Sequence, residues 1–552
     1  MRSTAPTPRA ALDPVTLAVL RGRLESIADE MDATLFRAAF NPTIAEAHDA
    51  CNGLYDAATG ATLVQGKSGL PIFVGVMAHA VAAVIGKFKG SNAPRPGDVF
   101  LFNDPYLGGT HLSDMRLVAP YFRDRELFCW LASVGHWHDV GGAVPGNYNP
   151  SATEYWQEGV LIPPVRLVAA GRTQHDILEI VLAASRLPDS AYGDLHAHLS
   201  ALDLGAGRLD ALLNAYGTET VAAAFVELTA RAGAQMRSAL AGLPDGTWAE
   251  EDYLDNDGRT DEPIRIACRV TKEGEALTLD FTGTSRQVAG PVNIARPTTV
   301  ASIYVALKHI FPEVAANSGV LEPIRLVIPD GCVLDAQRPA PVGGYTETIL
   351  RIIDVLFCAF ARIRPDAAYG NAYGTINALS IAGVRDGRRW VMFSFFGGGH
   401  GGNPEGDGLS HGNAPIATAI IPPVEITEAA YPVRFTQWAL RDGSGGAGAH
   451  RGGLGAVYEI EVDCDGAEVF VFGDRARFAP RGVLGGGNGL PNDVAVGGPD
   501  GWKRPPLGAK AVGVRLARGE RVRIATPGGG GWGDAALRDA DMIDLDRRMG
   551  LV

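Results

Sequence analysis

Glycine sets the strongest constraint on how this chain can fold. The 552 residues include 70 glycines, which follow no fixed period and gather in the last third of the chain, at 395–408, 443–455 and 526–534. A collagen-like fibre needs glycine at every third position, so these clusters exclude it. Because glycine tolerates positive φ angles, the clusters predict many tight turns between strands. We therefore expect a β-rich C-terminal region with glycine turns.

The length of the chain predicts more than one hydrophobic core. Single cores stop growing near roughly 250–300 residues, so a multi-lobed architecture is expected. We place domain boundaries at 1–215, 216–385 and 386–552, and we expect the last domain to end in a docking segment. No repeat of about 20 to 50 residues is evident, which argues against a solenoid or a propeller.

Hydrophobic spacing alternates between helical and strand periods, which is typical of an α+β fold. A helix is expected to begin at Asp13-Pro14 and to end near Asn41, and a β-hairpin to follow from about Ala50 to Gln65. The N-terminal region should thus combine helices with a mixed sheet. Further helices are expected at 71–87, within 177–216, and at 220–243, 298–310 and 346–363, and further strands at 98–103, 115–122, 127–134, 263–271 and 275–283.

Charge and apolar runs argue against two classes of partner. The net charge is −13, from 49 basic and 62 acidic residues, and no basic run interleaved with aromatics occurs, so nucleic-acid binding is not expected. The longest apolar run, at 71–86, is shorter than the ~20 residues that a membrane span needs. Six widely spaced cysteines without a CxxC pair suggest neither a disulfide framework nor a cysteine zinc site, and we expect a cytoplasmic protein.

Two loops repeat one pattern of histidine and aspartate. The strand GDVFLF leads into NDPYLGGTHLSD, where His111 precedes Asp114 by three residues, and FCWLAS leads into SVGHWHDVGG, where His136 precedes Asp139 by three. Two adjacent strands that end at the same edge would bring these loops together. Imidazole nitrogen and carboxylate oxygen suit Zn²⁺, Mn²⁺ or Fe²⁺. Ordinary turn chemistry also explains Asp and Gly here, so a metal or acid/base site and a pair of plain turns both stand open.

Asp49, in the segment AHDAC, is a third candidate. Its place just before an apolar hairpin predicts a half-buried carboxylate. Such a group must be paired or bound to a metal to offset its desolvation. A simple boundary acid is the alternative reading of this residue.

Several long motifs in one order resemble the hydantoinase B/oxoprolinase family, which includes subunits of N-methylhydantoinase, caprolactamase and the acetone and acetophenone carboxylases. The resemblance covers nearly the whole chain. It is carried by DPVTLAVLRGRLESIADEM, NDPYLGGTHLSD, GHWHDVGGAVPG, GPVNIARPTTVASIYVAL, NSGVLEPI, PVEITEAAYPVRF, HRGGLGAVYEI and TPGGGGWGD.

The resemblance implies site residues. The metal ligands fall on Asp49, His111 and His136, with Asp114 as a fourth contact to Zn²⁺ or Mn²⁺. His138 and Asp139 then become candidates for proton transfer or for orienting the ligands.

The resemblance also implies a function within a hetero-oligomer. A hydantoinase A-type partner subunit would use ATP with Mg²⁺ to phosphorylate a carbonyl or enol oxygen, and this chain would complete hydrolysis of a small cyclic amide. No GxxxxGK motif followed by Ser or Thr occurs in this chain, in agreement with a separate ATP-binding subunit. A ketone carboxylase subunit is the alternative, and a non-catalytic scaffold is a third reading.

The chain departs from the family pattern in two places. Phe73, in LPIFVGVM, stands where a histidine is expected, and FFGGGHGGNPEGDG differs in detail from the hydantoinase form. These departures leave the substrate open.

Overall fold

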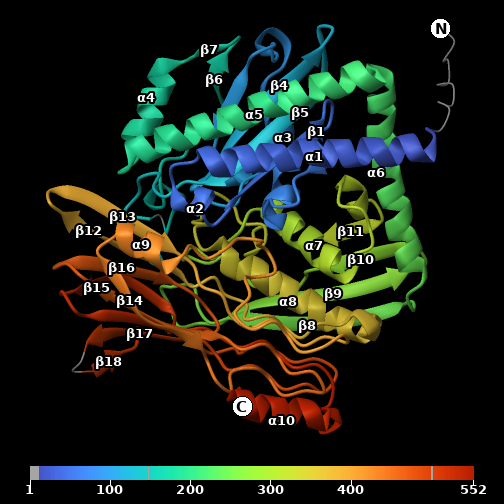
Figure 1. Ribbon diagram of the computed structural model, residues 1–552. Coiled ribbons are helices and arrows are strands. Elements are labelled where there is room, and N and C mark those ends of the chain that lie inside the picture. The colour runs from blue at the N-terminus through green and yellow to red at the C-terminus, as the bar shows by residue number, and fades with distance from the viewer. Residues whose placement is uncertain (1–11, 147, 499–500, 552) are drawn as a thin grey trace.

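The computed structural model describes residues 12–146, 148–498 and 501–551 (Figure 1). Helices are interspersed among four sheets whose strands pair mainly antiparallel, which confirms the predicted α+β class. The N-terminal part contains α1 (Pro14–Ala38), α2 (Pro42–Ala45), β1 (Ala50–Asp56), β2 (Thr62–Gln65), α3 (Pro71–Lys87), β3 (Val99–Phe102), β4 (Asp114–Arg123), β5 (Glu126–His136), β6 (Val165–Ala169), β7 (Arg172–Thr173), α4 (His175–Ala183) and α5 (Pro188–Tyr216).

The rest of the chain adds three further sheets. The middle part contains α6 (Thr218–Ala241), β8 (Gly246–Leu254), β9 (Ile264–Glu273), β10 (Ala276–Asp280), α7 (Arg296–Ile310), β11 (Ile324–Val327) and α8 (Tyr345–Ile363). The C-terminal part contains β12 (Ala378–Arg385), β13 (Arg388–Ser394), α9 (Val424–Ala430), β14 (Val433–Leu440), β15 (Ala456–Val462), β16 (Ala467–Phe472), β17 (Asp493–Gly498), β18 (Gly501–Lys503), β19 (Lys510–Leu516), β20 (Arg521–Ala525) and α10 (Ala540–Met549).

The N-terminal sheet has seven strands in the order β2-β1-β5-β4-β3-β6-β7. Every pair in it is antiparallel, rather than mixed as expected. The pairs β1–β2, β4–β5 and β6–β7 are joined by short hairpin turns, which require antiparallel pairing because a parallel pair needs a crossover of about a dozen residues. The described strands pair in parallel only at β10 and β11.

Helices cover both faces of this sheet. Leu117 and Leu131 pack toward α1 and α5, which lie side by side across one face (Figure 1). Successive side chains alternate between faces, so Val118 and Ala132 point to the opposite face and join the core that includes α3, α7 and α8. Asp114 is an even number of residues from Val118, and its side chain therefore points toward this second core.

Local sequence explains where α1 begins and which face it buries. The Asp13 side chain accepts a hydrogen bond from the backbone N–H of Thr16 at 2.9 Å, and Pro14 occupies the first helical position. Leu20, Leu24 and other residues at three- and four-residue spacing are buried, as the pattern predicts.

The glycine clusters act mainly through close backbone approach. Gly399 donates to Pro527 O at 3.1 Å, and Gly529 donates to Gly453 O at 2.9 Å, so loops distant in sequence bond directly to one another. A Cβ on Gly399 would lie 1.9 Å from Gly453 O, closer than any side chain allows. The expected turns do occur, for example at Gly443 with φ 64°. Most of the clustered glycines instead let backbone pack on backbone.

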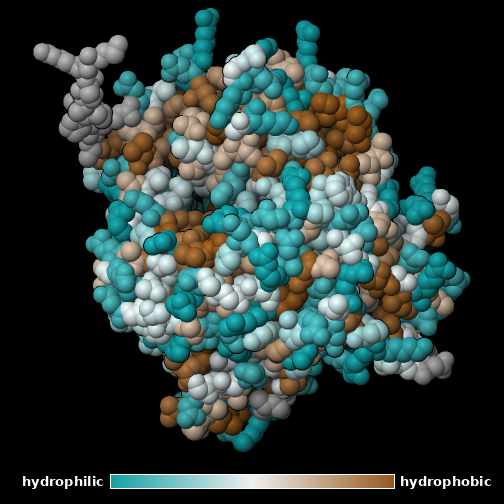
Figure 2. Space-filling view, turned by 180° about the vertical axis from the view of Figure 1, so that it is seen from behind, coloured by the Kyte–Doolittle hydropathy of each residue, from teal (hydrophilic) through white to brown (hydrophobic). Residues whose placement is uncertain are grey.

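The three predicted domain ranges stay a prediction, and the largest core draws residues from all of them, including Tyr55, Tyr345 and Phe472. On the face shown in Figure 2, hydrophilic residues predominate and hydrophobic ones form separate patches. Among the residues that the structure describes, no helix is both long enough and apolar enough to cross a membrane.

Candidate metal centre

Strand pairing brings the two His/Asp loops together. β4 begins at Asp114, β5 ends at His136, and these two residues face each other as the first pair of the antiparallel ladder. His111 is carried back toward them by the preceding loop, whose shape is fixed by Asn103: its side-chain amide donates to Leu112 O at 2.8 Å. Gly108, with φ 87°, lies so close to α3 that a Cβ would be 2.3 Å from the backbone nitrogen of Ala80.

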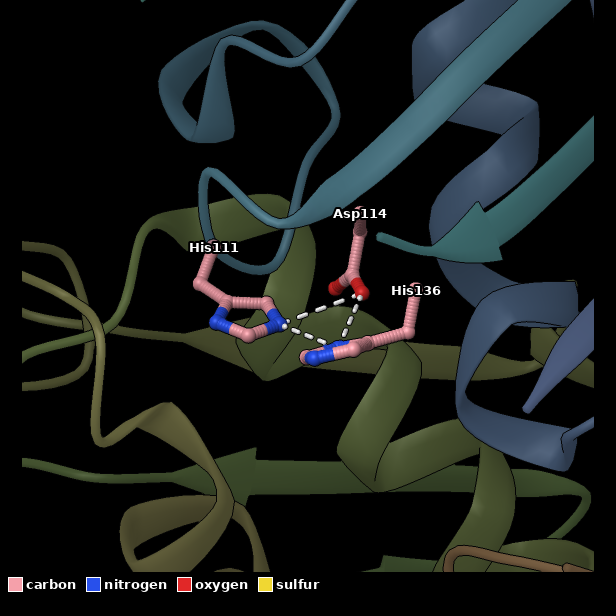
Figure 3. Close-up of side chains that lie close together, drawn as sticks. All are labelled: His111, Asp114 and His136. Atoms are coloured by element: carbon pink, nitrogen blue, oxygen red, sulfur yellow. Dashed lines mark hydrogen bonds and ion pairs between the residues drawn. The ribbon is translucent and has the colours of Figure 1, made fainter. Parts of the chain in front are cut away.

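Three side-chain atoms converge at this strand edge (Figure 3). His111 Nε2 lies 3.1 Å from Asp114 Oδ1 and 3.2 Å from His136 Nδ1, and His136 Nδ1 lies 3.4 Å from the same Asp114 oxygen. All three side chains are buried. The prediction that the two loops converge is therefore confirmed.

The spacing of these atoms suits a shared metal ion. Donors that bind one divalent ion at about 2.0–2.2 Å stand roughly 2.8 to 3.6 Å apart at angles between the octahedral and tetrahedral values. The three observed distances fall inside that range. Each neutral imidazole has one lone pair and a carboxylate has only lone pairs, so the arrangement offers three acceptors to one point. The cluster can hold a metal ion.

The second oxygen of Asp114 is held by a relay from the same loop. Thr110 Oγ1 donates to Asp114 Oδ2, and Arg116 Nη2 donates to Thr110 Oγ1 at 3.0 Å. Burial favours the neutral acid, but the charges and hydrogen bonds of His111 and His136 outweigh it and hold the pKa of Asp114 below its usual value. The carboxylate is thus both ionised and fixed in orientation.

Asp49 lies beside the cluster. Its carbonyl accepts a hydrogen bond from the backbone N–H of His136 at 3.1 Å, while Asn41 Nδ2 donates to the carbonyl of His136 at 2.7 Å. Burial raises the pKa of Asp49 to about 7; the His136 charge opposes this rise and the Asp114 charge adds to it. The structure therefore places Asp49 within electrostatic reach of the three convergent residues.

His138 and Asp139 differ in their surroundings. His138 is buried, and burial lowers its pKa to about 3, with His136 acting in the same direction. The Asp139 carboxylate is already bonded: it accepts from Arg186 Nη1 at 2.8 Å and from the backbone N–H groups of Arg186 and Gly141 at 2.9 and 3.0 Å. These bonds shape the loop that carries His138. A role in proton transfer stays a prediction for both residues.

A cavity of about 40 Å³ adjoins the cluster and is lined in part by Asp49, Tyr148, Tyr345 and Phe393. The ring of His111 lies 4.9 Å from that of Tyr345 and 5.4 Å from that of Tyr148, and the ring of His136 stacks on Phe393 at 5.1 Å. The cavity thus joins residues from three distant parts of the chain.

Sequence reasoning missed these aromatic residues and the Thr110 relay. Thr110 could have been found, since it directly precedes His111 in the motif. Tyr345 at the start of α8 and Phe393 near the end of β13 carry no local signal, because only the packing of α8 and β13 against the sheet brings them to the cluster.

Comparison with known proteins places the chain in a family. The profile of the hydantoinase B/oxoprolinase family matches residues 13–535. Caprolactamase subunit beta from Pseudomonas jessenii is 32% identical, over 98% of this chain and 94% of that relative. The 5-oxoprolinase of Dictyostelium discoideum is 31% identical over 96% of this chain, which spans 41% of that longer protein.

Solved structures agree with the sequence matches. The crystal structure of the ATP-dependent caprolactamase from Pseudomonas jessenii superposes with a TM-score of 0.90 at 30% identity and covers 98% of this chain and 95% of that one. The nucleotide-free structure of acetone carboxylase gives a TM-score of 0.89 at 20% identity over 98% and 78% of the two chains, a likeness of fold alone. The chain belongs to the hydantoinase B/oxoprolinase family.

Proposed function

We propose that this chain is the metal-bearing subunit of an ATP-dependent cyclic-amide hydrolase, acting on a carbonyl that a partner subunit has activated by phosphorylation. The observation that carries the proposal is the convergence of His111 Nε2, Asp114 Oδ1 and His136 Nδ1 within 3.4 Å of one another. The family relationship supports it, because one relative is named a caprolactamase subunit and another a 5-oxoprolinase.

His111, Asp114 and His136 would hold the ion, with Asp49, which immediately precedes β1, as a further ligand. Their mixed nitrogen and oxygen donors suit Zn²⁺ or Mn²⁺. When bound, such an ion lowers the pKa of a coordinated water toward ~7 and polarises a carbonyl. The Thr110 hydroxyl keeps one Asp114 oxygen directed at the cluster, as outer contacts of metal ligands generally do.

Other residues would position the substrate and move protons. Tyr148 and Tyr345 line the cavity beside Asp49, where their hydroxyls can hydrogen-bond to an amide ring. His138 is proposed to pass protons at the cluster edge. Asp139, through its bonds to Arg186 and the loop backbone, would orient the segment that carries His138.

We further propose a hydantoinase A-type partner that binds ATP with Mg²⁺, in a cytoplasmic hetero-oligomer. The sequence lacks a GxxxxGK loop of its own, and the caprolactamase relative is named as one subunit of its enzyme. The six cysteines are buried and unpaired, as is usual for a reducing compartment.

Reconstitution tests the proposal. The chain combined with its ATP-binding partner is expected to hydrolyse a cyclic amide in an ATP-dependent manner, whereas the chain alone is inactive. A His111→Ala plus His136→Ala variant that still assembles should lose turnover and its bound metal together. Full turnover per assembled complex in that variant would instead support the scaffold reading.

A ketone carboxylase subunit is the second candidate, favoured by the shared fold with acetone carboxylase. The chain covers 95% of the caprolactamase chain but 78% of the acetone carboxylase chain, which favours the hydrolase. Incubation of the reconstituted complex with a ketone and labelled bicarbonate separates the two. Incorporation of label into product would identify a carboxylase.

A further inference from the structure

The cavity beside the metal cluster has mainly hydrocarbon walls. Leu70, Ile72, Ile376, Phe393, Phe395 and Ile416 contribute aliphatic and aromatic surface to it. The polar groups are few: Asp49, Asn413, Thr346 and the hydroxyls of two tyrosines. Such a site favours a small ring whose carbonyl and N–H meet a few polar groups while its carbon edge meets hydrocarbon.

None of the described residues that line this cavity is a lysine, arginine or histidine, and the single ionisable acid is Asp49. Two buried cations lie on neighbouring elements, and Arg116 keeps its Nε and Nη1 groups without a hydrogen-bond partner among the described residues. Arg116 donates to Thr110 at 3.0 Å, and Lys510 pairs with Asp474 at 3.0 Å. Neither residue lines the cavity.

A metal ion at the cluster would not supply the missing positive charge. Asp49 and Asp114, as carboxylates, carry two negative charges, which balance a divalent ion, and the neutral imidazoles of His111 and His136 add none. A further buried charge beside Asp114 is that of Arg116, whose guanidinium does not line the cavity. A carboxylate on the ring would also lose its water.

We infer that the site selects an uncharged cyclic amide and rejects the same ring when it carries a carboxylate. The inference rests on the proposed function, since it assigns the substrate class of that same site. It separates this chain from an enzyme for 5-oxoproline, because a buried carboxylate requires a cationic partner that the cavity wall lacks.

Two lactams that differ only in the carboxylate test the inference. Binding of 2-pyrrolidinone and of 5-oxoproline to the full chain is measured by saturation-transfer NMR competition, once with a chelator and once with added Zn²⁺. We expect 5-oxoproline to bind at least tenfold more weakly in both conditions.

A positive charge placed in the cavity wall should weaken the preference for 2-pyrrolidinone over 5-oxoproline. Ala417 is half-buried and lines the cavity, so Ala417→Arg is expected to shift the affinity ratio at least tenfold toward 5-oxoproline, while the neutral Ala417→Gln leaves it unchanged. Ala419→Arg, at a second half-buried wall position, serves as an independent variant if Ala417→Arg does not fold.

Equal or tighter binding of 5-oxoproline by the unmodified chain, with or without Zn²⁺, overturns the inference, as does failure of 2-pyrrolidinone to bind. The measurement uses neither ATP nor partner. Absent metal or absent turnover would contradict the proposed function, and neither result changes the measured preference between the two lactams.

Discussion

Two buried clusters of ionisable side chains differ in what their aspartates contact: arginine and lysine in one, and histidine in the other. One joins Arg351, Arg475 and Lys510 to Asp252, Asp354 and Asp474, with Arg351 Nη2 lying 3.0 Å from Asp474 and Arg475 Nη1 lying 3.2 Å from Asp252. The other is the cluster of His111, Asp114 and His136, in which Asp114 forms ion pairs, among the described residues, only with the two imidazoles.

The difference is one of charge balance. Three cations face three carboxylates in the arginine network, so the folded chain neutralises it unaided. The histidine cluster instead directs lone pairs at one point, and the guanidinium of Arg116 reaches Asp114 only through the Thr110 hydroxyl. A buried set of charges in which each carboxylate pairs directly with a cation serves the fold, whereas a carboxylate that forms direct ion pairs only with imidazoles is suited to share an ion with them.

The largest expected effect comes from breaking the balanced network. Arg351→Met would leave Asp354 and Asp474 without their shared guanidinium, and the removal of one partner from a buried ion pair costs about 3–5 kcal/mol. Denaturant unfolding measures the loss. Arg504→Met, at an exposed pair with Asp493, is the matched control and should change stability little. Equal losses of stability in both variants would contradict the greater importance assigned to the buried network.

Metal addition should affect only the incomplete cluster. At a free Zn²⁺ concentration of about 100 times Kd, binding to the folded state stabilises it by about 2.7 kcal/mol, so the melting temperature should rise. The rise should vanish in His111→Ala plus His136→Ala. The control variant carries His175→Ala plus His196→Ala, at two exposed histidines outside the cluster, and should keep the full shift. A shift of equal size in both double variants would place the ion elsewhere.

The hydrogen bonds through Thr110 should affect metal affinity more than the stability of the fold. Thr110→Val removes the hydroxyl between Arg116 and Asp114, and the loss of such an outer contact lowers metal affinity about 10- to 100-fold. Titration with a competing chelator measures it. Thr299→Val is the matched control, because the buried Thr299 hydroxyl donates to Leu334 O, away from the cluster. If both variants bind metal equally well, the relay has no such role.

Asp32 is a buried carboxylate outside both clusters, and its substitution gives the smallest expected effect on stability. Its Oδ1 accepts two hydrogen bonds from Asn52, while the buried Oδ2 has no hydrogen-bond partner among the described residues, and burial raises its pKa to about 7. The folded state then binds a proton more tightly than the unfolded state, so stability falls as the pH rises through 7.

Asp32→Asn should remove that pH dependence. Between pH 6 and 8 the wild-type protein is expected to lose about 1.4 kcal/mol more than the variant, as measured by unfolding at each pH. The difference arises because the carboxylate must ionise in a buried site, whereas the amide carries no charge. If the stability of the two proteins changed with pH in the same way, the burial of Asp32 would not raise its pKa as expected.

The sequence alone determined local structure and the residue types of the site. Helix periods, the Asp13 cap and the alternation in β4 and β5 follow from nearest neighbours along the chain, so α1 and both strands could be predicted. The paired motifs with His111 and His136 could likewise be predicted, because each follows a strand.

Only the tertiary structure decided what surrounds those residues. The strand register set Asp114 opposite His136, and the packing of α8 and β13 brought Tyr345 and Phe393 to the same cluster. Glycines predicted as turns proved to be points where distant backbones bond, as between Gly529 and Gly453. These features rest on contacts between residues far apart in the chain, and local sequence preferences carry no information about such contacts.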